Sequence, residues 1–243
     1  MIFGFLLILV LCVFSMKQWR EVRVGIIDGL VNSSRINPAI ILLQKEFIES
    51  KSGTFDCELP SHADQVAGLI LESAPAAKLV MCSIFGRQSF ASVSTVVEAL
   101  RWLADLNLDL INLSFGTNVY SKELEDICFW VSSYGTLLIC SSPARGKAVY
   151  PAAFDCCIAV SGDARCSPGQ ISFLGTELAD FGTHPFVEIN NPKAGGGASF
   201  ATARLSGLVS ELIAVGCPRE AIIEELKNRC SFYGPEQKRA APQ

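Results

Sequence analysis

The chain has 243 residues, of which 50% are apolar and 18% are charged, and its formal net charge is −4. This composition is too apolar for a disordered chain, and the length suffices for one large domain with its own core. The negative charge and the lack of a basic run argue against a nucleic-acid partner, because phosphate recognition requires clustered Lys and Arg.

Residues 1–15 form an apolar stretch without a charged side chain. It lacks the basic start and the cleavage site of a signal peptide, and it is slightly shorter than the roughly 20 apolar residues that span a bilayer. Two interpretations are favoured equally: a marginal membrane anchor through residues 1–16, and a misassigned start with translation beginning at Met16. A cleavable signal peptide ranks third. We expect a folded domain over 16–232 and a flexible tail over 233–243. The expected location is cytoplasmic, with membrane anchoring as the alternative.

From Val22 onwards, short apolar segments alternate with helical segments. In chain order the sequence predicts a strand at 22–27, a helix at 62–73, a strand at 78–85, a helix at 92–106, a strand at 108–115, a helix at 122–133, strands at 136–141 and 156–161, and a helix at 199–214. The strands are almost continuous apolar runs, which is typical of parallel strands covered by helices on both faces. The alternation predicts an α/β fold with one doubly wound, mainly parallel sheet in a single domain.

The ten cysteines lie mostly inside apolar runs, as Cys82, Cys140 and Cys157 do. We interpret them as buried, reduced thiols and not as a disulfide framework, because disulfide scaffolds are short and rich in loops. The chain has no C-x-x-C motif, and neither His62 nor His184 has a cysteine at ligand spacing. The sequence therefore predicts no metal site.

Three residues with hydrolytic chemistry fall at the predicted ends of elements. Asp28 follows the first strand, His62 lies in the first turn of a helix, and Ser199 follows three glycines at the start of the last helix. Each has an ordinary structural explanation, because Asp is common in turns, a lone His is more often structural, and Ser often caps helices. Together, in the order Asp, His, Ser, they match one known order of the hydrolytic triad.

The segments around these residues resemble motifs of the subtilisin-like (S8) family of serine proteases. IIDG (26–29) is similar to the family's first motif, HADQVAG (62–68) to H-G-T-x-V-A-G, and GGASFATARLSG (196–207) to G-T-S-M-A-x-P with its following helix. Between them, APAAKLVMCSIFG, DLINLSFG and YPAAFDCCIAVSG resemble the family's A-P-x-A, D-V-I-N-M-S-L-G and Y-P-A segments. The matches extend from Val22 to Ala214 in the family's order.

The resemblance implies a role for each residue of the triad. Ser199 is expected to attack the scissile carbonyl, His62 to take its proton and return it to the leaving amine, and Asp28 to orient the imidazole. The backbone N–H of Ser199 is expected to bind the oxyanion, since a glycine-rich approach to a helix amino terminus presents amide groups to an anion.

A second segment is implied to bind substrate. The matching family strand pairs with the extended substrate, so main-chain hydrogen bonds would hold a peptide here as an added strand. The residues at these positions are Ser114, Phe115 and Gly116.

The chain departs from the family at the oxyanion asparagine. An ungapped match places Ala144 there, and loss of this donor costs about 3 to 4 kcal/mol in subtilisin itself. We expect the hydroxyl of Ser141 or Ser142 to be the candidate replacement. Ala203 and Arg204 also stand where the family has Pro and His, which we interpret as divergence in the supporting helix.

The resemblance implies a serine endopeptidase that needs no cofactor and whose partner is a peptide or protein precursor. The buried, reduced cysteines and the lack of signal-peptide features favour an intracellular enzyme. Only 27 residues precede Asp28, which is too few for the folding-assisting propeptide of secreted subtilases. A small protease of this kind is expected to be a dedicated enzyme that removes a leader peptide from a precursor. The candidate precursor is the cross-linked small subunit of quinohemoprotein amine dehydrogenase. The alternative, favoured by Ala144, is a catalytically weak or inactive protein that binds peptides without cutting them.

Overall fold

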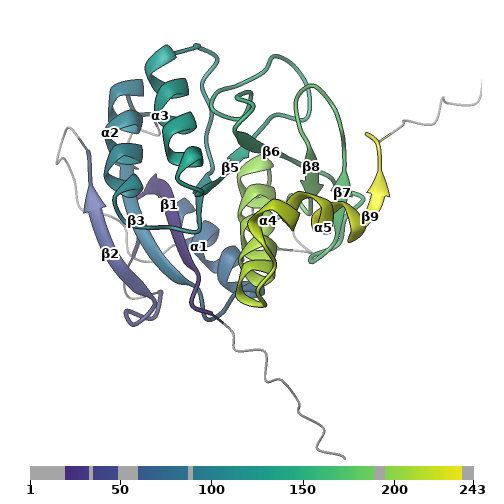
Figure 1. The fold of residues 1–243 in the computed structure, drawn as a ribbon, viewed down its shortest axis with the longest axis horizontal. Coiled ribbons are helices and arrows are strands. Elements are labelled where there is room, and N and C mark those ends of the chain that lie inside the picture. Colours follow the sequence, from purple (N-terminus) through teal and green to yellow (C-terminus); the bar gives the residue numbers. More distant parts are fainter. Residues whose placement is uncertain (1–19, 33–34, 49–59, 87–89, 189–194, 237–243) are drawn as a thin grey trace, which may run out of the picture.

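In a computed structural model, the described residues are 20–32, 35–48, 60–86, 90–188 and 195–236, and they form one sheet of nine strands (Figure 1). The order across the sheet is β2-β3-β1-β4-β5-β6-β8-β7-β9. Neighbouring strands are parallel except for β7 and β8. The strands are β1 (Arg23–Gly29), β2 (Ile41–Glu46), β3 (Lys78–Phe85), β4 (Leu110–Leu113), β5 (Leu137–Ser141), β6 (Cys157–Gly162), β7 (Ile171–Phe173), β8 (Phe181–Thr183) and β9 (Cys230–Tyr233).

The predicted α/β fold with a mainly parallel sheet is confirmed. The helices are α1 (His62–Ser73), α2 (Val93–Ala104), α3 (Lys122–Ser133), α4 (Ala198–Ala214) and α5 (Ile222–Asn228), with a short 3₁₀ helix η2 (Arg219–Ala221) before α5. The bounds predicted for α1, α3 and β3 are those observed. Strand β2 was not predicted: its side chains are mostly exposed, and its apolar residues are confined to its first half. The short elements β7, β8, α5 and β9 were not predicted either, because they are too short to show a periodicity.

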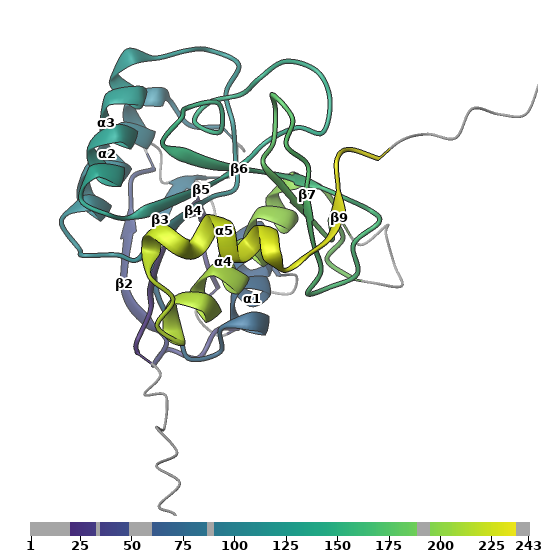
Figure 2. The same cartoon turned by 45° about the vertical axis from the view of Figure 1, so that its right-hand side comes forward.

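The helices form a layer on each face of the sheet, as the two views of Figures 1 and 2 show. Helices α1, α4 and α5 pack on one face, and α2 and α3 pack on the other. Consecutive side chains of a strand point to opposite faces, so Ile26 of β1 lies in the first layer and Ile27 in the second. Both are fully buried, which explains why the strands are almost continuously apolar.

Helices α1 and α4 cross at an unusually small separation. A Cβ atom placed on Gly207 of α4 would lie 2.7 Å from the carbonyl oxygen of Ile70 in α1. Only a glycine fits at such a crossing, because any side chain would push the two helix backbones apart. The crossing also sets the distance between His62, where α1 begins, and Ser199, near the start of α4.

The last strand, β9, joins the carboxyl-terminal residues to the sheet. It ends at Tyr233, where the predicted tail begins, and the N–H of Gly234 donates to the carbonyl of Phe173 at 2.8 Å. The first two residues of the predicted tail are therefore held by the sheet. The rest of the predicted tail from 237 and the apolar stretch at 1–15 lie outside the described residues.

Eight cysteines lie in the described ranges, and none of them forms a disulfide. Five are buried, including Cys82, Cys140 and Cys157 as the sequence predicted. Burial raises the pKa of the Cys82 thiol to about 12.

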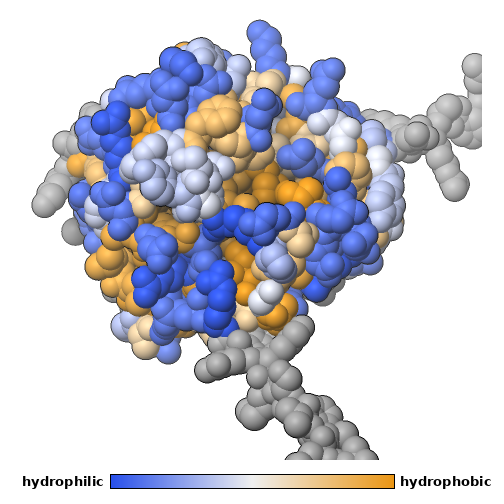
Figure 3. Space-filling model, in the orientation of Figure 1, coloured by the Kyte–Doolittle hydropathy of each residue, from blue (hydrophilic) through white to orange (hydrophobic). Residues whose placement is uncertain are grey.

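On the face seen in Figure 3, hydrophilic side chains interrupt the hydrophobic areas. The described helices include none that is both long enough and apolar enough to cross a bilayer.

Candidate active site

Asp28 lies at the carboxyl end of β1, in the middle of the sheet. Its carboxylate is buried, and its Oδ1 accepts the backbone N–H of Gly29 at 2.7 Å. Parallel strands end at the same edge of a sheet, and this edge is where ligands and reactive groups collect in open α/β folds. The position predicted from the sequence is the position observed.

His62 is the first residue of α1, and a capping box fixes the start of this helix. The hydroxyl of Ser61 accepts the N–H of Asp64 at 3.0 Å, while the Asp64 carboxylate accepts the N–H of Ser61 at 2.9 Å. The same carboxylate accepts the N–H of Asn32, which follows β1, at 2.8 Å. Asp64 thus connects the segment after Asp28 to the start of the helix that carries His62.

The imidazole of His62 is hydrogen-bonded to the carboxylate of Asp28. Nδ1 lies 2.9 Å from each carboxylate oxygen, and because an ionised carboxylate only accepts, Nδ1 carries the proton and Nε2 is left as the acceptor. The Asp28 side chain is 3% exposed and that of His62 is 44% exposed. The imidazole is therefore accessible to solvent, while the carboxylate that binds it is buried. Partial burial lowers the pKa of His62, but the hydrogen bond and the charge of Asp28 outweigh it and hold this pKa above its ordinary value of 6.5.

Ser199 is the second residue of α4, and glycines form the approach to this helix. Gly195 and Gly197 have φ angles of 133° and 142°, which residues with side chains rarely adopt. The cap residue is Gly197 and it provides no side-chain hydrogen bond, so Ser199 is not a capping serine. Its N–H therefore belongs to the first helical turn, whose amide groups have no partner within the helix.

The side chain and backbone of Ser199 form two hydrogen bonds with Ser114, directly after β4. The Ser199 hydroxyl donates to the Ser114 carbonyl at 2.8 Å, and the Ser114 hydroxyl donates to the Ser199 carbonyl at 3.1 Å. Phe200, the next residue of α4, packs its ring against the imidazole of His62, with 5.2 Å between ring centroids. The first turn of α4 thus lies beside the imidazole, although the Ser199 hydroxyl is hydrogen-bonded to Ser114 and not to His62.

The segment predicted to bind substrate follows β4 without joining a strand. Thr117 and Tyr150 form an antiparallel bridge beyond it, and the ring of Phe115 packs edge-on against Phe85 with 5.7 Å between centroids. Gly116 is exposed, and within the described ranges its backbone N–H and carbonyl have no hydrogen-bond partner. A Cβ atom at Gly116 would lie 2.7 Å from a methyl group of Val149, so this close approach requires glycine.

The three positions considered for the oxyanion have different surroundings. Ala144 is exposed in the turn after β5, and its methyl group offers no hydrogen bond. The Ser142 hydroxyl is buried and donates to the carbonyl of Leu178, so its proton is already used within the fold. Ser141 is half-buried at the end of β5. Of the two serines, Ser141 is the one left with a hydroxyl that could be directed to a ligand.

Asp64 and Arg204 connect the segments around this site, and neither was predicted from the sequence to do so. Asp64 was detectable, because Ser61-His62-Ala63-Asp64 has the capping-box pattern. Arg204, interpreted as simple divergence, is buried, with its guanidinium 2.7 Å from Glu72 of α1 and donating to the carbonyl of Phe186 at 3.0 Å. It connects α4 to α1 and to the segment before the glycines, and no local pattern indicates these distant partners.

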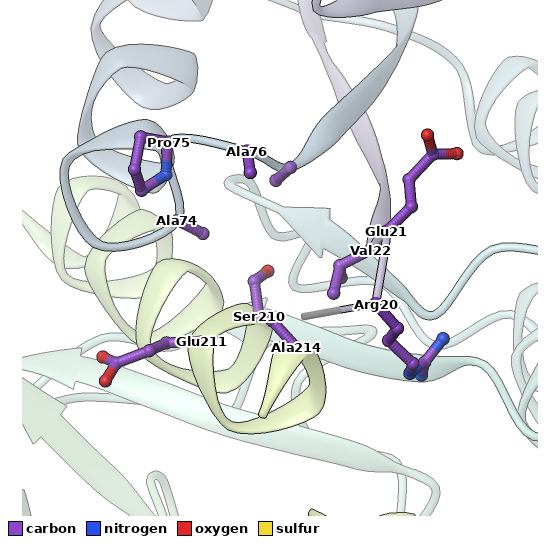
Figure 4. A pocket seen from close by; sticks show the side chains of 10 residues that line it. Arg20, Glu21, Val22, Ala74, Pro75, Ala76, Ser210, Glu211 and Ala214 are labelled. Atoms are coloured by element: carbon purple, nitrogen blue, oxygen red, sulfur yellow. The ribbon is translucent and has the colours of Figure 1, made fainter. Parts of the chain in front are cut away.

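A cavity of about 370 Å³ lies away from these residues (Figure 4). It is lined mainly by apolar groups around Val22, Ala74 and Ala214, at the amino-terminal end of β1 and therefore at the opposite edge of the sheet from Asp28. The Ser210 hydroxyl at its wall donates to the carbonyl of Ser206. Within the described ranges, His, Cys, Asp and Glu form no group of three or more that could hold a metal ion.

The chain matches no family model, but it is similar to several bacterial proteases. It is 26% identical over 182 residues to the thermostable alkaline protease of Halalkalibacterium halodurans, covering 68% of this chain and 49% of that protein. It is 26% identical over 217 residues to subtilisin NAT of Bacillus subtilis subsp. natto, covering 79% and 55%. Over 110 residues, or 41% of each chain, it is 30% identical to subtilisin Savinase of Lederbergia lenta.

The chain is distantly similar to several subtilisins. It spans about half the length of the first two of these relatives. The mostly parallel sheet with helices on both faces is a subtilisin-like α/β fold.

Proposed function

We propose that the protein is a serine endopeptidase that uses Asp28, His62 and Ser199 as its catalytic triad. The observation that carries the proposal is the hydrogen bond between the His62 Nδ1 and the buried Asp28, beside the first turn of α4. In this tautomer His62 Nε2 can accept the proton of Ser199 while its oxygen attacks a peptide carbonyl, and can then give the proton to the leaving amine. The charge of Asp28 stabilises the imidazolium that forms between these two steps.

The proposed reaction requires one movement of a side chain. In the resting protein the Ser199 hydroxyl donates to the Ser114 carbonyl, so a rotation about χ1 has to direct it to His62 before attack. Rotation between staggered positions is ordinary for serine, and catalytic hydrogen bonds often tighten only when substrate binds. A peptide N–H that bonded to the same carbonyl would compete with Ser199 and favour this rotation.

The tetrahedral oxyanion is proposed to bind the N–H of Ser199, with the Ser141 hydroxyl as its second donor. The first-turn amides of α4 favour negative charge because of their free hydrogens and the helix dipole. The substrate is proposed to lie extended along Ser114, Phe115 and Gly116, since the free backbone groups of Gly116 can pair with a peptide as an added strand.

A fluorophosphonate probe tests the proposal directly, because it reacts with a serine only where a base activates the hydroxyl. We expect labelling of the folded protein at Ser199, located by peptide mapping, and none in Ser199→Ala. The Ser210→Ala variant is the control for a buried serine on the same helix. Folded protein that stays unlabelled, with and without peptides present, would support the alternative of a protein that binds peptides without cutting them.

At a finer level, we propose that the enzyme is an intracellular processing protease that removes the leader peptide of one precursor. The support is the replacement of the oxyanion asparagine by Ala144, since a slow enzyme suffices where one substrate is held in position. The cross-linked small subunit of quinohemoprotein amine dehydrogenase is the proposed substrate. Cells that carry Ser199→Ala should accumulate its uncut precursor, and normal processing in these cells would exclude this role.

A further inference from the structure

A buried row of polar side chains connects the middle of α4 to the proposed nucleophile. The Ser206 hydroxyl donates to Asn112 Oδ1 of β4 at 3.0 Å, and Asn112 Nδ2 donates to the Ser114 hydroxyl at 2.8 Å. The Ser114 hydroxyl in turn donates to the Ser199 carbonyl at 3.1 Å. Ser206 and Asn112 are both completely inaccessible to solvent.

Only one set of hydrogen-bond directions satisfies every donor and acceptor in this row. The Asn112 Nδ2 is only a donor, so the Ser114 oxygen accepts from it and turns its own proton towards Ser199. The Asn112 Oδ1 is only an acceptor, and Ser206 supplies its hydrogen. Removal of the Ser206 hydroxyl would leave a buried carbonyl oxygen without a partner, and the amide would be free to rotate away from Ser114.

The direction of the Ser206 hydroxyl differs from that of its neighbours on α4. Thr202 and Ser210 each donate to the carbonyl four residues earlier in the helix, at 2.8 Å, which is the usual partner of a hydroxyl inside a helix. Ser206 instead donates across to the sheet, to a residue 94 positions away. This hydroxyl therefore contributes to the contact between α4 and β4, and not to the helix itself.

From this geometry we infer that Ser206 and Asn112 are positioning residues for the nucleophile. They hold Ser114, which holds Ser199 through its hydroxyl and its carbonyl, so the chain fixes the start of α4 relative to the segment expected to bind substrate. The inference rests on the proposed function, and it assigns to Ser206 a role that its burial in the middle of a helix does not suggest. Neither residue touches the reacting atoms.

Ser206→Ala and Ser210→Ala form a matched pair for testing this inference. Both serines are fully buried on α4, and both variants lose one hydroxyl. We expect the maximal rate of Ser199 labelling by a fluorophosphonate to fall about fivefold to tenfold in Ser206→Ala. The concentration for half-maximal rate should stay unchanged, and both values should stay close to wild type in Ser210→Ala. Thermal unfolding of each variant measures the general loss of stability separately.

A double-mutant cycle with Ser114→Ala identifies coupling through the row. If Ser206 acts through Ser114, Ser114→Ala should lose a similar part of the rate, and the double variant should lose no more than the larger single loss. Ser206→Thr, which keeps the hydroxyl, should recover most of the rate. If Ser206→Ala alone fails to fold, Ser206→Cys takes its place in the cycle, because a thiol is close in size to the hydroxyl but is a much weaker hydrogen-bond donor.

Equal labelling rates in Ser206→Ala and Ser210→Ala, or additive losses in the double variant, would overturn the inference while the labelled wild type still supports a protease. Absence of labelling in the wild type would instead overturn the proposed function. The two failures are therefore distinguishable in one experiment.

Discussion

Two parts of the same sheet edge offer very different groups to a reaction. At the end of β1, the buried carboxylate of Asp28 holds the imidazole of His62 in one tautomer. In the turn after β5, Ala144 presents a methyl group and the Ser142 hydroxyl is bonded to Leu178. The proposed proton-transfer groups and the second oxyanion donor thus lie on separate elements. Either can change without the other, and substitutions in each part should have separable effects.

The largest expected effect is the loss of the nucleophile. Ser199→Ala should lower peptide hydrolysis by about 10⁶-fold, because the residual rate then comes only from binding and the oxyanion site. The variant also loses the hydrogen bond to the Ser114 carbonyl, so thermal unfolding should accompany the assay to show that the protein is folded. Hydrolysis within tenfold of wild type would place the nucleophile elsewhere.

The next effect concerns the part of the site at the end of β1. Asp28→Asn keeps the shape of the side chain but removes the charge and favours the wrong tautomer of His62, so hydrolysis should fall about 10³-fold to 10⁴-fold. Asp163→Asn is the control, because Asp163 is also buried but pairs with Arg165. A similar loss in both variants would indicate a general effect of removing a buried charge.

The pH dependence of labelling gives a direct test of the same pair. His62 has to be neutral to accept a proton, so the labelling rate should fall tenfold per pH unit below a pKa that Asp28 holds above 6.5. In Asp28→Asn the negative charge that raises the pKa of His62 is lost, while partial burial still lowers this pKa. The acidic limb should therefore move to lower pH, and a limb at the same pH in both proteins would show that another group titrates.

The part of the site after β5 should respond in the opposite direction. Ala144→Asn restores an amide at an exposed position, and we expect hydrolysis to rise about tenfold if the new donor reaches the oxyanion. Ala148→Asn adds the same group elsewhere in the exposed turn and should leave the rate unchanged. An Ala144→Asn protein no faster than this control would mean that the turn after β5 does not face the oxyanion.

The smallest expected effect on the reaction comes from the crossing of α1 and α4. Gly207→Ala should destabilise the protein by about 1–3 kcal/mol, because the added methyl group overlaps the Ile70 carbonyl. Labelling should slow only a few-fold as the helices that carry His62 and Ser199 move apart. Gly68→Ala adds the same group to α1 in open space and should be neutral or stabilising. Chemical denaturation of both variants makes the comparison.

Several features of the site could be predicted because their signals are local. Asp28 follows an apolar run, Ser61 and Asp64 form a capping box around His62, and glycines precede Ser199. Strand β2 could not be predicted, since this exposed edge strand has three apolar residues followed by three polar ones and shows neither the alternating nor the continuous apolar pattern of a buried strand. The partners of Arg204 could not be predicted from a local sequence pattern either, because Glu72 lies 132 positions away in the chain.

The sequence by itself determined the order of the central strands and of the four longer helices, the α/β class and the three residues proposed to react. These follow from the periodicity of apolar side chains and from residues at the ends of elements, which act over a few positions. Only the tertiary structure decided where hydroxyl protons point: Ser199 to Ser114, Ser142 to Leu178 and Ser206 to Asn112. A serine hydroxyl can donate a hydrogen bond to any acceptor within reach, so its direction depends on which distant segments the fold places beside it.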